Sequence, residues 1–262
     1  MIFKLLFGDE RSIEQLTDFL KSVLRIPHDD YDELIIVDPH LLPEYKGGKL
    51  GIIDVKLKTK SGKTINVEIQ VEPMKELRER IIFYLSKMVA EQIGTSEDYE
   101  NIKRVISIVI TDYPLIKESP KYHHRFTLYD KENNVEFSDA TEIHTLEIPK
   151  LPNNEDGTPL WVWMKFLDAR TEEDLNMIAQ KSPQVKKAVV RLMELSADER
   201  TRMLYEAREK ERRDNYARER GAVKDNSFFI AKNLLKKNMP IDDIADVTGL
   251  TPTEVEGLQN AD

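Results

Sequence analysis

Residues 51–71 read GIIDVKLKTKSGKTINVEIQV, and this stretch decides the fold. Apolar and polar residues alternate from Thr64 to Val71, which is typical of a strand with one packed face and one polar face. Residues 51–60 also have the character of a strand, and a turn sequence at 61–63 separates the two segments. The stretch therefore predicts a β-hairpin.

The register of this hairpin follows from keeping its apolar residues on one face. A two-residue loop would set Asp54 opposite Ile69 and mix the two faces. A three-residue turn centred on Gly62 removes the conflict and pairs Asp54 with Gln70. Glu68 then lies diagonally across from Asp54, within reach of one cation.

Two converging carboxylates suit Mg²⁺, which binds one or two carboxylates and keeps several waters. Such an ion can polarise a phosphodiester and lower the pKa of a bound water, which Gln70 would orient. The pattern alone favours a plainer interpretation, in which this is the solvated face of a hairpin and Lys56 forms a cross-strand ion pair with Glu68.

The segments around the hairpin predict an α/β arrangement. A strand, a helix and a second, buried strand follow one another from 64 to 111, and this order implies a partly parallel sheet. Ser12 is expected to cap the first helix. Helices are expected at 12–25, 75–93, 160–168, 172–180, 183–195 and 198–221, and strands at 34–37, 51–60, 64–71, 105–111 and between 122 and 148.

The chain is expected to have three parts, with a core at 1–150, a helical extension at 151–222 and a small helical element at 223–262. The first boundary rests on a loop rich in proline and asparagine at 149–157.

The C-terminal element has the spacing of a helix-turn-helix at Ala245, Gly249 and Val255. Its second helix offers Glu254 and Glu256, which are poor partners for phosphate. We therefore expect a packing or assembly role for this element, and we place any homo-oligomer contact in the helical C-terminal region.

Composition narrows the class of protein. The 262 residues contain no cysteine, which excludes disulfides and thiolate zinc sites and favours a cytoplasmic location. No apolar stretch approaches the length of a membrane span, so we expect no membrane partner. The net charge of -9 argues against nucleic acid, but 39 Lys and Arg residues leave room for a local basic face.

Two further groups are expected to be structural. His123 and His124 are adjacent on an expected strand and would point to opposite faces, so they cannot converge on one ion. Trp161, Trp163 and Phe166 lie on an apolar helix and are expected in the core.

Four motifs occur together in the N-terminal part of the chain. They are FKLLFG at 3–8, DFLKSVL at 18–24, NVEIQ at 66–70 and R-x3-Y-x2-K at 80–87. Together they resemble the Rpn family of recombination-promoting nucleases and transposases, within the PD-(D/E)XK nuclease superfamily. The resemblance covers the N-terminal half closely and the helical remainder more loosely.

The resemblance implies an α/β, restriction-endonuclease-like core with a mixed central β-sheet flanked by helices, plus a helical C-terminal region. It also implies a metal-dependent DNA endonuclease linked to DNA recombination or mobile elements. Asp54 and Glu68 would bind the metal, Mg²⁺ with Mn²⁺ as a possible substitute. Gln70 would stand where many relatives have lysine.

Two more residues enter through the resemblance. Arg80 would contact phosphate, although a solvated arginine beside a packed tyrosine fits equally well. Glu10 or Glu14 would support the metal from the first helix. Two alternatives stay open: a non-catalytic nucleic-acid-binding or assembly protein on an inactivated nuclease fold, and a transposase that also joins strands.

Overall fold

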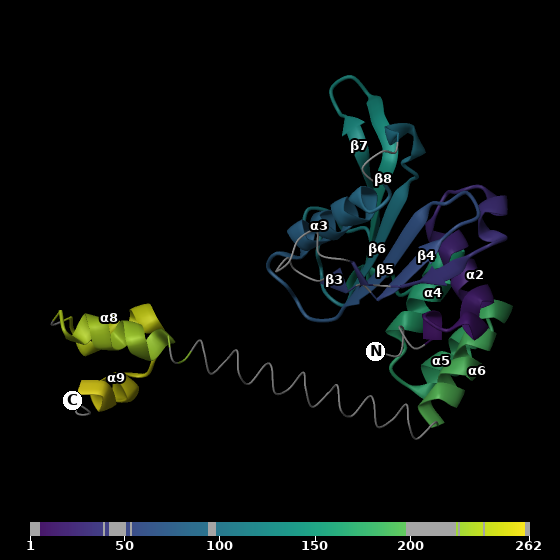
Figure 1. Ribbon diagram of the computed structural model, residues 1–262. Coiled ribbons are helices and arrows are strands. Elements are labelled where there is room, and N and C mark those ends of the chain that lie inside the picture. Colours follow the sequence, from purple (N-terminus) through teal and green to yellow (C-terminus); the bar gives the residue numbers. More distant parts are fainter. Residues whose placement is uncertain are drawn as a thin grey trace. The chain divides into compact units, whose positions relative to one another are not determined.

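The chain forms two compact units, residues 1–196 and 197–262 (Figure 1). The computed structural model describes residues 6–38, 40–41, 51–52, 54–93, 98–197, 224, 226–237 and 239–259. The helix expected at 198–221 lies outside the described residues. The division differs from the three parts expected from the sequence, because the helices at 159–197 pack within the first unit.

The first unit is built on a six-stranded mixed sheet with the order β1-β4-β5-β6-β8-β7. The strands are β1 (Ile35–Val37), β4 (Val55–Lys58), β5 (Thr64–Gln70), β6 (Val105–Thr111), β7 (His123–Asp130) and β8 (Val135–Glu147). β5, β6 and β8 run parallel, and the other pairs are antiparallel. A separate pair joins β2 (His40–Leu41) to β3 (Gly51–Ile52). The expected mixed α/β sheet is confirmed.

The hairpin turn between β4 and β5 is centred on Ser61. Thr59 N donates to Lys63 O at 3.0 Å and Gly62 N donates to Thr59 O at 2.9 Å, which leaves residues 60–62 as the loop. Gly62 has a φ of 86°, and glycine adopts this left-handed conformation without the steric cost of a Cβ. The turn centred on Gly62 itself was therefore a wrong prediction.

The register moves by two residues as a result. Val55 pairs with Val67, where the sequence predicted Ile69. A shift of two leaves every side chain on its expected face, because side chains alternate with a period of two. Continued by one residue, the observed register sets Asp54 directly opposite Glu68.

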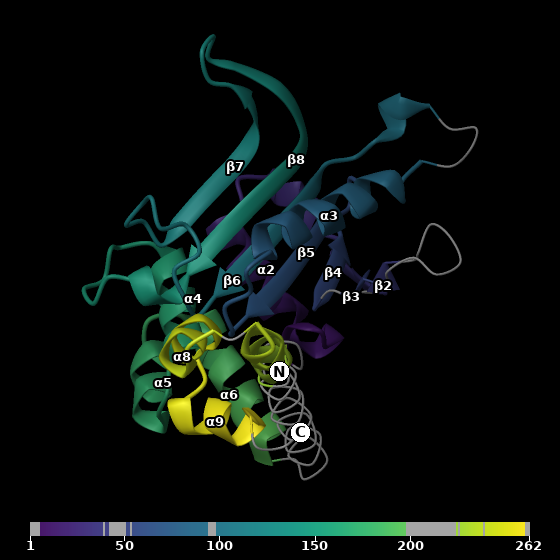
Figure 2. The same cartoon turned by 90° about the vertical axis from the view of Figure 1, so that its left-hand side faces the viewer.

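Helices cover both faces of the sheet (Figure 2). α3 (Leu77–Ala90) packs on one face against Val105 and Val109. α2 (Ile13–Val23) and α4 (Pro159–Asp168) pack on the other face, and α5 (Glu172–Ala179) and α6 (Pro183–Ala197) complete that layer. None of the helices in the described ranges combines the length and apolarity that a bilayer span requires.

The core between α2 and α4 is centred on aromatic rings. Trp163 lies 5.8 Å from Phe7 and 6.0 Å from Phe19, measured between ring centroids. Trp161 and Phe166 are also buried, so the expected core role of these aromatic residues is confirmed. Phe7 belongs to the FKLLFG motif, and its place in this core gives that motif a structural role.

The start of α2 departs from the expected cap. Ser12 occupies the N-cap position, but its hydroxyl makes no side-chain capping bond. A 3-10 turn at Glu10–Ser12 precedes the helix, and Asp9 caps that turn by accepting from Arg11 N at 3.0 Å. The side-chain cap is therefore supplied by the Asp9 carboxylate, at the start of the 3-10 turn, and not by the Ser12 hydroxyl.

The second unit has the packing of a helix-turn-helix. Its helices are 226–235, α8 (Ile241–Thr248) and α9 (Pro252–Gln259). Gly249 ends α8 with a φ of 70°, while Ala245 and Val255 are buried in the core of the unit. The three positions therefore have the structural roles expected from their spacing.

β7 and β8 carry a row of connected polar side chains on the α2 face, of which Glu142 and His144 are buried. His123 Nε2 and His144 Nδ1 lie 2.8 Å apart, and His144 contacts Glu142, which also binds Arg125 at 2.9 Å. His124 contacts Thr145 on the opposite face. The expectation that the two adjacent histidines point apart is confirmed.

The row of side chains around His123 predicts that the stability of the first unit depends on pH. The pKa of His123 is lowered from 6.5 to about 4, chiefly by burial; the charges of His144, His124 and Arg25 also lower it, and that of Glu142 opposes them. The unfolded state therefore takes up a proton between these pH values that the folded state refuses, and stability falls as the pH drops through this range.

The free energy of unfolding of the wild type should fall between pH 7 and pH 4.5. We expect this fall to be about 1–2 kcal/mol smaller in His123→Gln, after allowance for solvent screening. Urea unfolding at pH 7 and pH 4.5, followed by tryptophan fluorescence, measures it, since both tryptophans lie in the first unit. His28→Gln removes an exposed histidine and is the control. An unchanged difference between the two pH values in His123→Gln would contradict the prediction.

Candidate active site

The polar face of β5 is covered by protein. Asn66 and Glu68 are only 1% and 4% exposed, because α3 packs over this face of the sheet. Lys56 pairs with Glu91 of the α3 C-cap at 2.9 Å, where the plainer interpretation paired it with Glu68. The interpretation as a solvated hairpin surface is therefore wrong for Glu68, while Asp54 and Gln70 are partly exposed.

Asp54 and Glu68 form the acidic part of the site. Asp54 Oδ2 accepts a hydrogen bond from Ile69 N at 3.0 Å, which fixes this carboxylate beside the end of β5. Burial raises the pKa of Glu68, the charge of Arg80 opposes that rise, and the charge of Asp54 adds to it. Glu68 is thus held beside a second carboxylate in a place where water stabilises its negative charge poorly.

Arg80 approaches Glu68 from α3. Its Nη2 donates to Glu68 Oε1 at 2.8 Å, and its guanidinium lies 5.1 Å from the centroid of the Tyr84 ring. Residues four apart share a helix face, so α3 presents both side chains together. Lys87, the third residue of the motif, is buried with its Nζ 5.4 Å from the centroid of the Phe83 ring. Arg80 is therefore an ion-pair partner of Glu68 and not simply a solvated arginine.

Gln70 lies two residues after Glu68 on the same face of β5. Its side chain is partly exposed, and Nε2 donates to Glu72 O at 3.0 Å. Its backbone carbonyl accepts from Asp112 N at 3.3 Å, which ties the end of β5 to the segment after β6. The amide is thus held at the edge of the site next to solvent.

The two N-terminal acids lie outside this group. Glu10 is exposed in its 3-10 turn, and Glu14 forms an ion pair with Lys187 at 2.7 Å. Among the described residues, no contact joins either carboxylate to Asp54 or Glu68. A metal-supporting role for Glu10 or Glu14 remains a prediction.

The residues present fit a divalent cation bound by two carboxylates. Within the described ranges no three His, Cys, Asp or Glu side chains cluster in a way that would hold a metal. Mg²⁺ does not require such a cluster, because it takes one or two carboxylates and fills its remaining positions with water and phosphate oxygens. A cation between Asp54 and Glu68 would also relieve their mutual repulsion.

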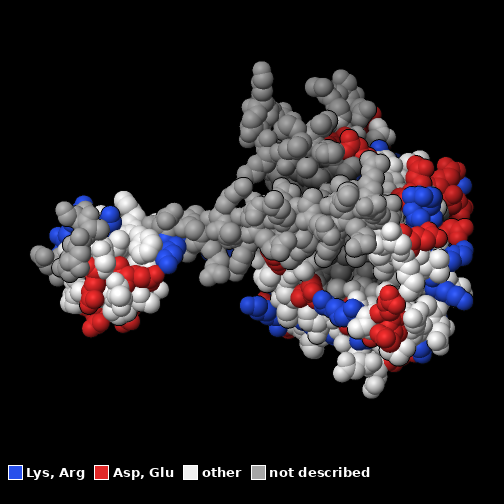
Figure 3. Space-filling model, turned by 90° about the horizontal axis from the view of Figure 1, so that it is seen from below, with Lys and Arg blue, Asp and Glu red and all other residues white. Residues whose placement is uncertain are grey.

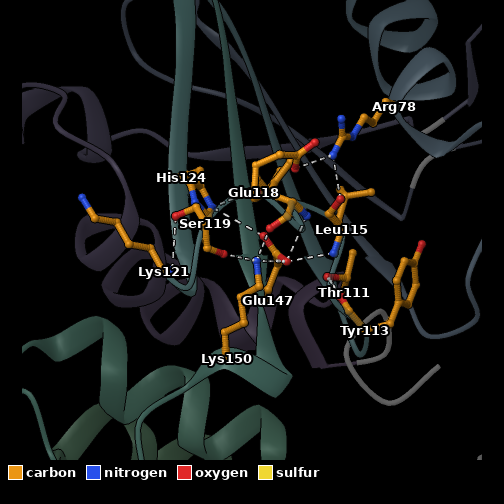
Figure 4. Close-up of polar contacts among 12 residues, drawn as sticks. Arg78, Thr111, Tyr113, Leu115, Glu118, Ser119, Lys121, His124, Glu147 and Lys150 are labelled. Carbon is orange, nitrogen blue, oxygen red and sulfur yellow. Dashed lines mark hydrogen bonds and ion pairs between the residues drawn. The ribbon is translucent and has the colours of Figure 1, made fainter.

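Sequence reasoning missed the segment after β6, residues 112–121. Figure 4 shows that the side chain of Glu147, which is 0% exposed, fastens this segment. Its Oε2 accepts from Leu115 N at 2.8 Å and Ile116 N at 3.1 Å, and it pairs with Lys150 Nζ at 2.8 Å. No local pattern signals the two backbone contacts, since they join residues more than thirty positions apart, whereas Lys150 lies three residues after Glu147.

A comparison with known families agrees with this geometry. The family described as PD-(D/E)XK nuclease family transposase matches residues 1–222, which include the whole sheet and the Asp54, Glu68 and Arg80 group. No curated protein and no solved structure matches the chain. Because the match spans most of its length, the chain belongs to the PD-(D/E)XK nuclease family transposases.

Proposed function

We propose that this protein is a metal-dependent DNA endonuclease that hydrolyses phosphodiester bonds, acting in DNA recombination or on mobile elements. The observation that carries the proposal is the buried Glu68 carboxylate beside the partly buried Asp54, with Arg80 donating to Glu68. A solvated sheet face has no need to bury such a group, whereas a phosphodiesterase needs carboxylates for a metal and a cation for phosphate.

Each residue has a role in this mechanism. Asp54 and Glu68 would hold Mg²⁺, with Mn²⁺ as an alternative, and the bound ion would supply an activated water and stabilise charge on the phosphate. Gln70 would orient the attacking water, since an amide can position a water but brings no charge. Arg80 would turn from Glu68 to a phosphate oxygen once the carboxylates are engaged, and its partly exposed side chain leaves room for that movement.

The charged surface limits where DNA can bind. On the face shown in Figure 3, the described Lys and Arg residues lie among Asp and Glu residues, without a continuous basic field. Mixed charges attract DNA weakly, because affinity for the backbone depends on neutralising several phosphates together. We place the DNA contact at the Arg80 end of α3, where the Arg80 side chain is partly exposed.

The test is nicking of supercoiled plasmid by the purified protein with Mg²⁺, with Mn²⁺ and with EDTA, beside Asp54→Asn purified in parallel. We expect nicking that needs the metal and is lost in the variant. Cleavage that persists in Asp54→Asn would move the activity to another centre. DNA binding without cleavage under any divalent metal would favour the non-catalytic alternative.

A further inference from the structure

The hydroxyl of Tyr113 is a buried polar group that the proposed mechanism does not use. It is buried and makes no hydrogen bond of acceptable geometry among the described residues. The ring packs under α3 against the cluster of Leu77, Ile81 and Val109. A buried hydroxyl without a partner is destabilising, so its presence at this position needs an explanation.

Tyr113 stands next to the candidate active site. β6 ends at Thr111, which is paired with Gln70 at the end of β5, and Tyr113 follows two residues later. Its ring packs in the same cluster as Met74, and Met74 Sδ lies 3.7 Å from Arg80 Nη1. Burial raises the pKa of Tyr113, and the Met74 backbone lowers it. The charges of Glu68 and Arg80 also reach the phenol, the first raising its pKa and the second lowering it. The phenol is therefore a neighbour of the Glu68–Arg80 pair.

The backbone around Tyr113 is held firmly. Thr111 Oγ1 donates to the carbonyl of Tyr113 at 2.7 Å, and Arg78 Nη2 donates to Leu115 O at 2.8 Å. Glu147 binds the next two amides of the segment, as described above. In Figure 4 the ring of Tyr113 points away from Glu147, so the network fixes the backbone without engaging the phenol.

Glu68 needs a second hydrogen-bond donor when Arg80 moves away from it. In the proposed mechanism Arg80 leaves Glu68 once a cation engages the carboxylates, and the Glu68 carboxylate then loses its partner in a buried position. Carboxylates that bind metals are normally hydrogen-bonded through their outer oxygen, which sets their orientation. The Tyr113 hydroxyl lies on the same α3 side of the sheet, and its hydrogen is donated to no acceptor among the described residues.

We propose that Tyr113 is a positioning residue of the Glu68 site, whose hydroxyl donates to the Glu68 carboxylate and holds it in the orientation that binds a divalent cation. This inference rests on the proposed function. It assigns Tyr113 an effect on metal affinity that a residue with only a packing role does not have.

The test is Mn²⁺ binding without DNA, measured by electron paramagnetic resonance on the full chain. Tyr113→Phe keeps the ring and removes the hydroxyl, and we expect the dissociation constant for Mn²⁺ to rise about 10-fold, the lower end for loss of such a partner. The matched control is Tyr31→Phe, which removes another buried hydroxyl, bonded to Leu20 O at 3.4 Å in the core on the α2 side of the sheet. That variant should bind Mn²⁺ like the wild type.

The outcomes separate this inference from the proposed function. If the wild type binds no Mn²⁺ at millimolar concentration, the proposed metal site and the role of Tyr113 both fail. If the wild type binds and Tyr113→Phe binds equally well, only the role of Tyr113 is overturned. Equal weakening in Tyr113→Phe and Tyr31→Phe would also overturn it, because the effect would then reflect general loosening of the unit.

Discussion

Replacement of Glu68 by glutamine is expected to lower the rate of plasmid cleavage by about 10³-fold or more. The variant keeps the shape of the side chain but removes one of the two charges that would hold the metal. Charge stabilisation by a catalytic metal is worth several kcal/mol, and each 1.36 kcal/mol changes the rate about tenfold. Nicking rates under single-turnover conditions with saturating Mg²⁺ measure the loss.

The control for this variant is Glu79→Gln. Glu79 is an exposed acid in the first turn of α3, next to Arg80 in sequence but outside the site. We expect its cleavage rate to stay within about twofold of the wild type, in line with the small effects of surface changes. Equal losses in both variants would show that the assay reports overall charge, and Glu68 would lose its assignment as a ligand.

Arg80→Gln is expected to destabilise the first unit by about 2–3 kcal/mol when divalent metals are chelated. The Glu68 side chain is 5% exposed and that of Arg80 29% exposed, so the variant leaves a buried carboxylate without its cation. Breaking a fully buried pair costs roughly 3–5 kcal/mol, and the partial exposure of Arg80 reduces that figure. Urea unfolding followed by tryptophan fluorescence measures the first unit alone, since Trp161 and Trp163 both belong to it.

A double-mutant cycle identifies the cause of this loss. Glu68→Gln combined with Arg80→Gln removes both charges, and we expect the double variant to recover about 1–2 kcal/mol relative to the sum of the single changes. Strict additivity would contradict the ion pair as the source of the effect. Mg²⁺ added to Arg80→Gln should restore stability, because a ligand that binds the folded state stabilises it.

Local pattern was enough to predict most elements of the sheet. β6 spans Val105–Thr111, the bounds expected from its run of β-branched residues, and β5 ends one residue before the expected end. Alternation along β5 also assigned Glu68 to the correct face. Such signals are strong because burial on one or both faces of a strand leaves a periodic trace in the sequence.

The sequence could not show how that face is used. Both a solvated face and a covered one give the same alternation, and only the packing of α3 makes Glu68 a buried residue. The hairpin register was missed by two residues because Gly62 fits more than one turn position. The Glu147 network and the place of Tyr113 depend on contacts between distant segments, which leave no periodic trace.

The parallel pairing of β5, β6 and β8 also sets the order in which the site can be completed during synthesis. The hairpin with Asp54 and Glu68 needs only neighbouring residues, whereas Glu147, which fastens the segment beyond Tyr113, is the last residue of β8. Non-local strand pairing is slow to form, and chains begin to fold from their N-terminal part as they are made. A ribosome-bound chain would therefore carry both acidic residues well before the segment around Tyr113 is locked in place.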